Sequence, residues 1–382
     1  MATLAPFKEA VDAVEEAGGE AFKLCYQCGL CTGTCPWNTV RSFLVRRMMH
    51  EAQLGLIDFE GEDVWLCATC RACVERCPRE VPIIDIMMAL RRTVVGLGIG
   101  PIPDSLRISM KNISAMGNPL GEEREQRADW AQGLDVKSFT EDTELLYFPC
   151  CIPAYDPRGK KIARAMVGIL KAAGVDFGIL GPEENCCGES VRKAGNETLF
   201  EGLAQSNITV FDKKGVKKIV TSSPHCYNTF KNEYPELGAN FEVIHYTQYL
   251  AELIKEGRLK LTKEIKKRVT YHDPCYLGRH NGIYDEPREI LKSIPGLELV
   301  EMHNSQQNSL CCGGGGGRIW METKKGERFS DIRIEQAIEM GAEFLVTACP
   351  YCIINFEDSV LTADKSEVIQ VKDISELVEQ AI

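Results

Sequence analysis

The C-terminal two-thirds of the chain alternates short apolar runs with amphipathic stretches. Leu145–Phe148 and Val216–Thr221 are rich in apolar and β-branched residues and predict buried strands. Lys160–Ala173 and Asn196–Lys214 carry apolar residues at helical spacing, and a glycine follows each stretch. The same order of elements recurs further along, in Arg268–Tyr271, Arg288–Ile294, Leu297–Met302, Arg328–Met340 and Phe344–Thr347. This alternation predicts two α/β domains with parallel sheets.

The N-terminal third follows a helical pattern instead. Thr39–Leu56 has apolar residues at helical spacing, with Asn38 as its expected N-cap. Ile83–Val95 predicts a further helix. The stretch from Gly96 to Asp142 contains several prolines and mixed charge without sustained periodicity. We expect it to be a connector on the surface.

Composition and charge narrow the class of protein. Of 382 residues, 44% are hydrophobic and 26% charged, as in soluble globular proteins. The net charge of −11 argues against a nucleic-acid binder, which would need a basic face. No stretch approaches the ~20 apolar residues that cross a bilayer, and the first residues carry charges where a signal peptide needs an apolar run. We therefore expect a cytoplasmic protein, held at the inner face of a membrane only through a partner.

Cysteine is the unusual residue, with 18 copies. In a long cytoplasmic chain this number favours thiolate-bound metal over disulfides. Two runs share the pattern C-x2-C-x2-C-x3-C-P, the signature of bacterial two-cluster ferredoxins, whereas zinc sites usually use separated C-x2-C pairs. In that signature the fourth cysteine of each run ligates the other cluster. We therefore expect two [4Fe-4S] cubane clusters, one on Cys25, Cys28, Cys31 and Cys77, the other on Cys67, Cys70, Cys73 and Cys35.

The remaining cysteines reveal a duplication. The positions of the first copy recur 124 to 126 residues later, pairing Cys151 with Cys275, Cys186 and Cys187 with Cys311 and Cys312, and Cys226 with Cys352. A constant offset of this size indicates two homologous domains. We expect a ferredoxin module over residues 1–100, a connector over 101–142, and cysteine-rich domains over 143–262 and 263–382.

The second copy is complete, with five cysteines, of which two are adjacent. Adjacent cysteines do not easily serve one tetrahedral zinc, and five thiolates exceed what one zinc or one cube needs. The glycine run Gly313–Gly317 lacks the G-K-[ST] ending of a phosphate loop. We expect Gly313, Gly314 and Gly315 to bring the backbone close to an inorganic core and to donate N–H groups to it. A flexible linker is the alternative.

These features together resemble the catalytic subunit of heterodisulfide reductase and the iron–sulfur subunits of glycolate oxidase and anaerobic glycerol-3-phosphate dehydrogenase. The stretches HDPCYLGRHNGIYDEPR, CCGGGGGRIWME and ACPYC are close to that family's motifs. The resemblance implies an α+β multidomain protein. A mostly helical two-cluster ferredoxin module, similar to that of succinate dehydrogenase iron–sulfur subunits, comes first. Two α/β CCG domains follow it. It also implies a non-cubane [4Fe-4S] cluster on Cys275, Cys311, Cys312, Cys349 and Cys352.

The first copy departs from that pattern. Ser223 stands where the second copy has Cys349, and Cys150 lies next to Cys151 and could compensate. Three outcomes stay open for the site formed by Cys151, Cys186, Cys187 and Cys226. It holds a non-cubane cluster with fewer thiolates, it holds a simpler cluster or zinc, or it holds nothing.

Two functions fit the sequence. The first is an oxidoreductase subunit of a multisubunit complex in anaerobic metabolism, which carries single electrons to one or two non-cubane centres and reduces a small disulfide. The second is a non-catalytic electron-transfer subunit between a flavin dehydrogenase and a quinone or membrane b-type cytochrome. The chain has no Rossmann fingerprint, so we expect a flavin-containing dehydrogenase or hydrogenase-type subunit as partner, and no flavin or nicotinamide here. His272 is a candidate proton donor.

Overall fold

The computed structural model describes residues 6–382, which form two compact units. Unit 1 contains the chain up to Ile108 together with two distant segments, Ser190–Phe200 and Gly313–Phe329. Unit 2 is made of Ser109–Glu189, Glu201–Cys312 and Ser330–Ile382. Each distant segment of unit 1 follows a pair of adjacent cysteines in the sequence. The two CCG repeats therefore each contribute a short segment to the ferredoxin-type unit.

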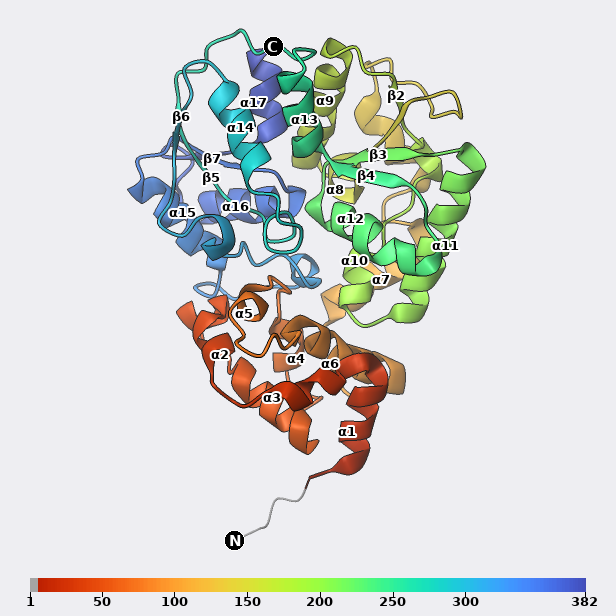
Figure 1. The fold of residues 1–382 in the computed structure, drawn as a ribbon, viewed down its shortest axis with the longest axis vertical. Coiled ribbons are helices and arrows are strands. Elements are labelled where there is room, and N and C mark those ends of the chain that lie inside the picture. Colours follow the sequence, from red (N-terminus) through yellow and green to blue (C-terminus); the bar gives the residue numbers. More distant parts are fainter. Residues whose placement is uncertain (1–5) are drawn as a thin grey trace. The chain divides into compact units, whose positions relative to one another are not determined.

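Unit 1 is mostly helical (Figure 1). Its helices include α1 (Lys8–Val14), α2 (Leu30–Thr34), α3 (Val45–Leu54), α4 (Asp63–Leu66), α5 (Ala72–Glu75), α6 (Ile83–Leu97) and α10 (Glu189–Lys193). The helix expected from Ile83 is confirmed as α6, whose buried face packs against α1 and α4. The prediction that Asn38 is the N-cap of a helix is wrong. Its side chain accepts a hydrogen bond of 3.1 Å from the amide of Phe43 and donates one of 2.9 Å to the carbonyl oxygen of Phe43. These bonds hold a loop, and α3 begins only at Val45.

Unit 2 contains two parallel four-stranded sheets with the same strand order. The first sheet runs β2-β1-β3-β4 and the second runs β6-β5-β7-β8. The strands are β1 (Leu145–Phe148), β2 (Phe177–Gly178), β3 (Lys218–Thr221), β4 (Glu242–His245), β5 (Arg268–Tyr271), β6 (Glu298–Val300), β7 (Phe344–Thr347) and β8 (Gln370–Asp373). The duplication and the parallel sheets predicted from the sequence are confirmed. In each sheet the chain order reverses between the two central strands, where ligand sites form at the carboxyl ends of parallel strands.

Helices flank the two sheets and join them (Figure 1). They are α8 (Cys151–Tyr155), α9 (Pro157–Ala172), α11 (Glu197–Lys214), α12 (Pro224–Asn228), α13 (Tyr246–Lys255), α14 (Asp285–Ser293), α15 (Phe329–Glu339), α16 (Pro350–Thr362) and α17 (Ile374–Ala381). Helix α17 of the second repeat packs on α9 of the first, and α13 of the first packs on α14 of the second. At this junction Tyr246 donates a hydrogen bond of 2.8 Å to Asp373. The two repeats therefore share one hydrophobic core.

The segment expected to be a surface connector enters the core. It forms α7 (Asp104–Met116) and a 3-10 helix, Arg124–Ala131. Trp130 is buried and meets Tyr147 edge-on at a centroid distance of 6.0 Å. Arg127 is also buried. Leu106, Met110 and Ile113 of α7 are buried at helical spacing, so this helix has an apolar face that the sequence reading overlooked.

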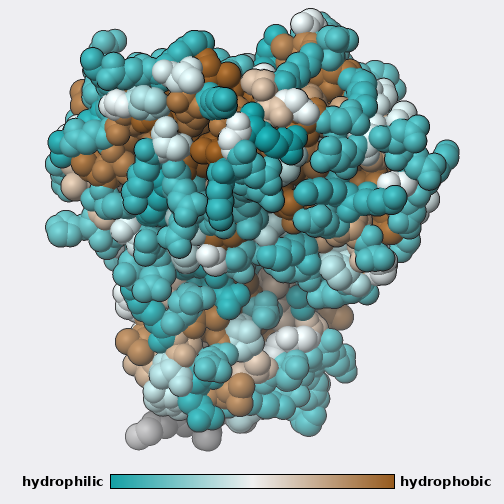
Figure 2. All heavy atoms as spheres, turned by 45° about the horizontal axis from the view of Figure 1, so that its top comes forward, coloured by the Kyte–Doolittle hydropathy of each residue, from teal (hydrophilic) through white to brown (hydrophobic). Residues whose placement is uncertain are grey.

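Hydrophilic side chains cover most of the face seen in Figure 2, with apolar side chains scattered among them. Such scattered apolar residues are normal on a protein surface. Among the helices of residues 6–382, none combines the length and the apolar character that a membrane crossing requires.

Candidate metal centres

Both ferredoxin-type runs fold into loops of matching geometry. Gln27 and Gly29 have φ angles of 68° and 87°, and the corresponding Thr69 and Arg71 have φ angles of 48° and 67°. Left-handed residues at every second position turn the backbone tightly and gather its amide groups into a concave nest that suits an anion. The three closely spaced cysteines of each run therefore face a common space.

The first cavity in unit 1 is lined by four cysteines and by apolar side chains that include Met49, Val81 and Ile83. The four are Cys25, Cys28, Cys31 and Cys77. Gln27 donates a hydrogen bond of 3.4 Å to the sulfur of Cys25. The fourth cysteine of the second run thus lies with the first three of the first run.

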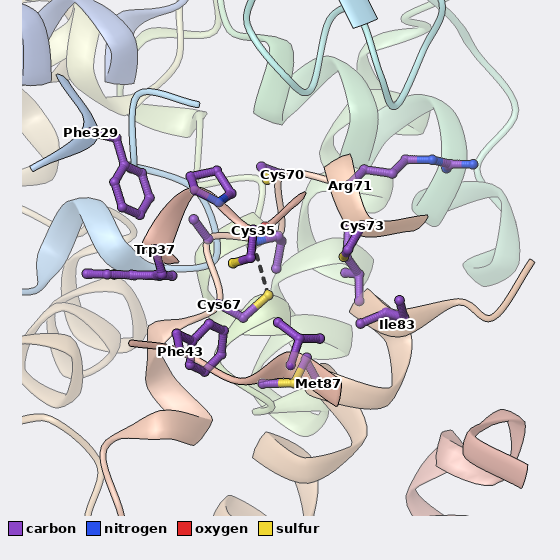
Figure 3. A pocket seen from close by; sticks show the side chains of 15 residues that line it. Cys35, Trp37, Phe43, Cys67, Cys70, Arg71, Cys73, Ile83, Met87 and Phe329 are labelled. Carbon is purple, nitrogen blue, oxygen red and sulfur yellow. Dashed lines mark hydrogen bonds between the residues drawn. The ribbon is translucent and has the colours of Figure 1, made fainter. Parts of the chain in front are cut away.

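The second cavity has the reciprocal composition (Figure 3). Its cysteines are Cys35, Cys67, Cys70 and Cys73. Phe43, Ile83 and Met87 line the same cavity, and the amide of Thr69 donates to the sulfur of Cys67 at 3.4 Å. Burial raises the pKa of the Cys35 and Cys73 thiols well above the usual range. A cation must therefore replace the thiol protons before these sulfurs can carry negative charge.

The donor sets of the two cavities fit thiolate-bound clusters. Each provides four sulfurs in a mostly apolar lining, and backbone or amide N–H groups reach a sulfur in both. Hydrogen bonds to sulfur and low solvent exposure are the means by which proteins tune such clusters. Each cavity contains three cysteines of one run and the fourth cysteine of the other, as ligand exchange between the runs requires. That these cysteines bind clusters stays a prediction.

The second CCG repeat collects its cysteines at the carboxyl ends of β5 and β7. All five are buried, namely Cys275, Cys311, Cys312, Cys349 and Cys352. The sulfurs of Cys312 and Cys352 are 3.3 Å apart. Hydrogen bonds from Cys311, Cys352 and His272 lower the pKa of Cys312 well below its usual value, although burial opposes this. His272, Cys312 and Cys352 offer ligand atoms within 4.8 Å of one another. This donor set favours a thiolate-rich metal group.

The glycine run belongs to unit 1 and packs closely against the backbone of a cysteine loop there. A Cβ at Gly316 would lie 2.4 Å from the carbonyl oxygen of Cys67, so only glycine fits there. Gly316 has a φ of 63°, and its carbonyl accepts a hydrogen bond of 2.8 Å from Arg91. A Cβ at Gly313 would lie 3.4 Å from the ring of Phe329, which is ordinary contact. The expected contact of Gly313, Gly314 and Gly315 with an inorganic core stays a prediction.

The first CCG repeat also forms a buried thiol cluster. The buried thiols interact in pairs, Cys151 with Cys186, Cys186 with Cys187, and Cys187 with Cys226. The guanidinium of Arg127 lies 3.7 Å from the sulfur of Cys151 and is paired with Glu184. Both side chains are only 2% exposed. Sequence reasoning missed Arg127 and Glu184, since neither lies in a recognisable motif.

A histidine of the first repeat serves the site of the second. His225 interacts with Cys349 and stacks on Tyr276 at a centroid distance of 4.1 Å. Its Nδ1 lies 3.1 Å from a carboxylate oxygen of Glu189. Burial opposes protonation of His225, but Glu189 and Cys349 outweigh it and raise its pKa to about 10. Burial likewise opposes ionisation of Cys349, but hydrogen bonds from Cys352 and His225 lower its pKa to about 6.

Comparison with known proteins agrees with this arrangement. Residues 24–81 match the 4Fe-4S dicluster domain, and residues 145–231 and 269–357 each match the cysteine-rich domain. The chain is 34% identical to a subunit of the dihydromethanophenazine:CoB–CoM heterodisulfide reductase of Methanosarcina mazei, with 94% of this chain and 93% of that protein covered. The chain belongs to the family of this heterodisulfide reductase subunit. Both domain types of this iron–sulfur family are therefore present here.

Other members of the family differ in name and length. The chain is 40% identical to the probable iron-sulfur-binding oxidoreductase FadF of Bacillus subtilis and 39% identical to the EtfAB:quinone oxidoreductase of Syntrophomonas wolfei. These alignments cover 84% and 86% of this chain but only 47% and 48% of those proteins. The chain thus spans about half the length of these two relatives. A solved structure of a hypothetical protein from Helicobacter pylori has a TM-score of 0.53, 12% identity and coverage of 88% of this chain and 65% of its own, which supports the fold alone.

Proposed function

We propose that the chain is the iron–sulfur subunit of an oxidoreductase complex and reduces a small disulfide at the second CCG repeat. The ferredoxin-type cysteines hold two [4Fe-4S] cubanes, and Cys275, Cys311, Cys312, Cys349 and Cys352 hold a non-cubane [4Fe-4S] cluster. When bound, these clusters supply one-electron transfer. Cleavage of a disulfide needs two electrons and two protons and yields two thiols. In this proposal the ferredoxin module ends near residue 100, the connector near residue 142 and the first CCG domain near residue 262.

The residues around the second repeat have distinct tasks in this proposal. Burial of the five cysteines excludes water from the metal group. His272 interacts with Cys312 and His225 with Cys349, and both interactions favour the thiolate form of the cysteine. Glu189 orients the His225 ring through a contact of 3.1 Å and holds a proton on it. A flavin-containing dehydrogenase or hydrogenase-type subunit, or a membrane b-type cytochrome, supplies the electrons.

One observation carries the proposal most directly. Five cysteines of the second repeat are buried at the carboxyl ends of its strands, with two sulfurs 3.3 Å apart. A structural zinc site would use four ligands. A fifth thiolate beside an adjacent pair is the donor set that the heterodisulfide reductase resemblance implies.

The test measures disulfide reduction by the full chain, purified anaerobically and reduced with a viologen dye. We expect Cys312→Ser to abolish turnover and to remove a non-cubane EPR signal while the cubane signals persist. Cys187→Ser, in the repeat that carries Ser223, is the matched variant and should reduce turnover less. Loss of turnover in Cys187→Ser with full turnover in Cys312→Ser would reverse the assignment of the two repeats.

A second function has its own support. Two relatives at 40% and 39% identity are named as an iron-sulfur-binding oxidoreductase and an EtfAB:quinone oxidoreductase. In this function the chain accepts electrons from a flavoprotein and passes them to a quinone or a cytochrome. The same reduced protein, offered a disulfide and a short-chain quinone separately, distinguishes the two. Oxidation by the quinone alone would favour the electron-transfer function.

A further inference from the structure

Cys150 has an unusual backbone conformation at the end of β1. Its φ is 82° and its ψ is 166°, a region that glycine populates and other residues avoid. Strain of this kind persists only where the surroundings enforce it, and it gathers at functional sites. The corresponding position of the second repeat, one residue before Cys275, is Pro274, which cannot adopt a positive φ. The conformation is therefore a specific property of the first repeat.

This conformation brings the side chain of Cys150 into the thiol cluster. The thiol of Cys226 interacts with those of both Cys150 and Cys187. Together with the contacts that join Cys187, Cys186 and Cys151, this forms an unbroken series of five sulfurs. Every member is at most 7% exposed. The first repeat thus gathers as many buried thiols as the second.

The position of Cys150 within the series matches that of Cys349 in the second repeat. There, Cys352 contacts Cys312 on one side and Cys349 on the other. In the first repeat, Cys226 corresponds to Cys352 and contacts Cys187 on one side and Cys150 on the other. Cys150 therefore occupies the place that Cys349 has in the second repeat, although it comes from a different strand end.

Ser223, which has the sequence position of Cys349, performs another task. Its hydroxyl oxygen accepts a hydrogen bond of 3.5 Å from the amide of Cys226 and caps the N-terminus of α12. The residue is fully buried. Cys349 makes no such capping bond to α16. The hydroxyl of Ser223 is thus used by the backbone, as serine commonly is at an N-cap.

We propose that Cys150 is the fifth thiolate ligand of the first CCG repeat, which binds an iron–sulfur cluster of the same type as the second. Arg127, 3.7 Å from the sulfur of Cys151, offsets part of the negative charge of such a cluster. This inference rests on the proposed function in one respect, that CCG repeats hold iron–sulfur clusters.

The test compares iron content and Mössbauer spectra of the full chain, purified anaerobically, with those of Cys150→Gly. Glycine accepts the backbone conformation of residue 150 without strain, so folding is preserved while the sulfur is removed. We expect about sixteen irons per wild-type chain and a loss of about four in Cys150→Gly, with the cubane EPR signals intact. Cys349→Ser is the matched variant and should remove a similar number from the second repeat.

Ser223→Ala completes the test. It removes the hydroxyl of the residue that aligns with Cys349, which is the alternative candidate for the fifth ligand. We expect it to retain the iron of the first repeat and to lower thermal stability through the lost cap. Unchanged iron in Cys150→Gly, or loss of iron in Ser223→Ala with retention in Cys150→Gly, would overturn the role of Cys150. A wild-type chain with only the eight or so cubane irons would overturn the proposed function itself.

Discussion

The guanidinium of Arg91 donates a hydrogen bond of 2.8 Å to the carbonyl of Gly316. The same side chain donates to the carbonyl of Cys67 and to that of Lys193, both at 2.8 Å. One fully buried arginine thus joins a cysteine loop of the ferredoxin type to the segments that follow the adjacent cysteines of both CCG repeats. Gly316 is glycine because the Cys67 carbonyl leaves no room for a Cβ. The hydrogen bonds of Arg91 therefore join helix α6 to the Cys67 loop and to the segments that contain Lys193 and Gly316.

We expect Arg91→Lys to lower the free energy of unfolding by about 2–4 kcal/mol, because an ammonium cannot satisfy all the carbonyls that the guanidinium reaches. Urea denaturation of the anaerobic full chain, followed by circular dichroism, measures the effect. Arg107→Lys is the control in the same unit, since this arginine is 64% exposed and pairs with the exposed Asp104. Its replacement should change stability by less than about 0.5 kcal/mol. Equal effects of the two substitutions would show that the buried contacts of Arg91 do not stabilise unit 1.

The reciprocal cysteine cavities predict crossed effects of two substitutions. Cys77 lies in the cavity of Cys25, and Cys35 lies in the cavity of Cys67. Cys77→Ser should therefore damage the cluster nucleated by Cys25, and Cys35→Ser should damage the other. EPR spectra of the two reduced variants, with the two cubane signals assigned beforehand, measure this. Loss of the Cys67 cluster in Cys77→Ser would refute the ligand exchange.

Asp373 predicts a pH dependence of stability that is independent of the metal sites. Burial raises the pKa of its carboxyl to about 7, against hydrogen bonds from Ser375 and Tyr246 that favour the ionised form. The folded carboxyl therefore keeps its proton over a range in which the unfolded one, with a pKa of about 3.9, has lost it. Stability is fully present below that unfolded pKa and falls as the pH rises towards 7, by about 1.4 kcal/mol for each unit of pKa difference.

Asp373→Asn removes this titration, and we expect the variant to lose less stability than the wild type between pH 5 and pH 8. Melting temperatures at both pH values, for both proteins, give the comparison. Asn keeps an oxygen that can accept the capping bond from Ser375, so α17 should still form. A wild-type slope that persists unchanged in Asp373→Asn would assign the pH dependence to other groups.

Local spacing determined much of this protein. Strand β1 has the bounds that its apolar run predicts, and α6 begins at the expected Ile83. The cysteine spacing predicted which four thiols share each cavity of unit 1. The offset of the cysteine motifs predicted two similar sheets. These features were readable because helix and strand periods, tight loops and duplication leave their signals within short stretches of chain.

Tertiary structure alone decided the rest. It brought Arg127 from the expected connector to Cys151, His225 of one repeat to Cys349 of the other, and Arg91 to three distant carbonyls. It also showed that Ser223 caps a helix and that Cys150 interacts with Cys226, neither of which the sequence could show. Each of these relationships joins residues far apart in sequence or depends on one backbone angle. No local period encodes such contacts, since they form only when packed elements fix the direction of each side chain.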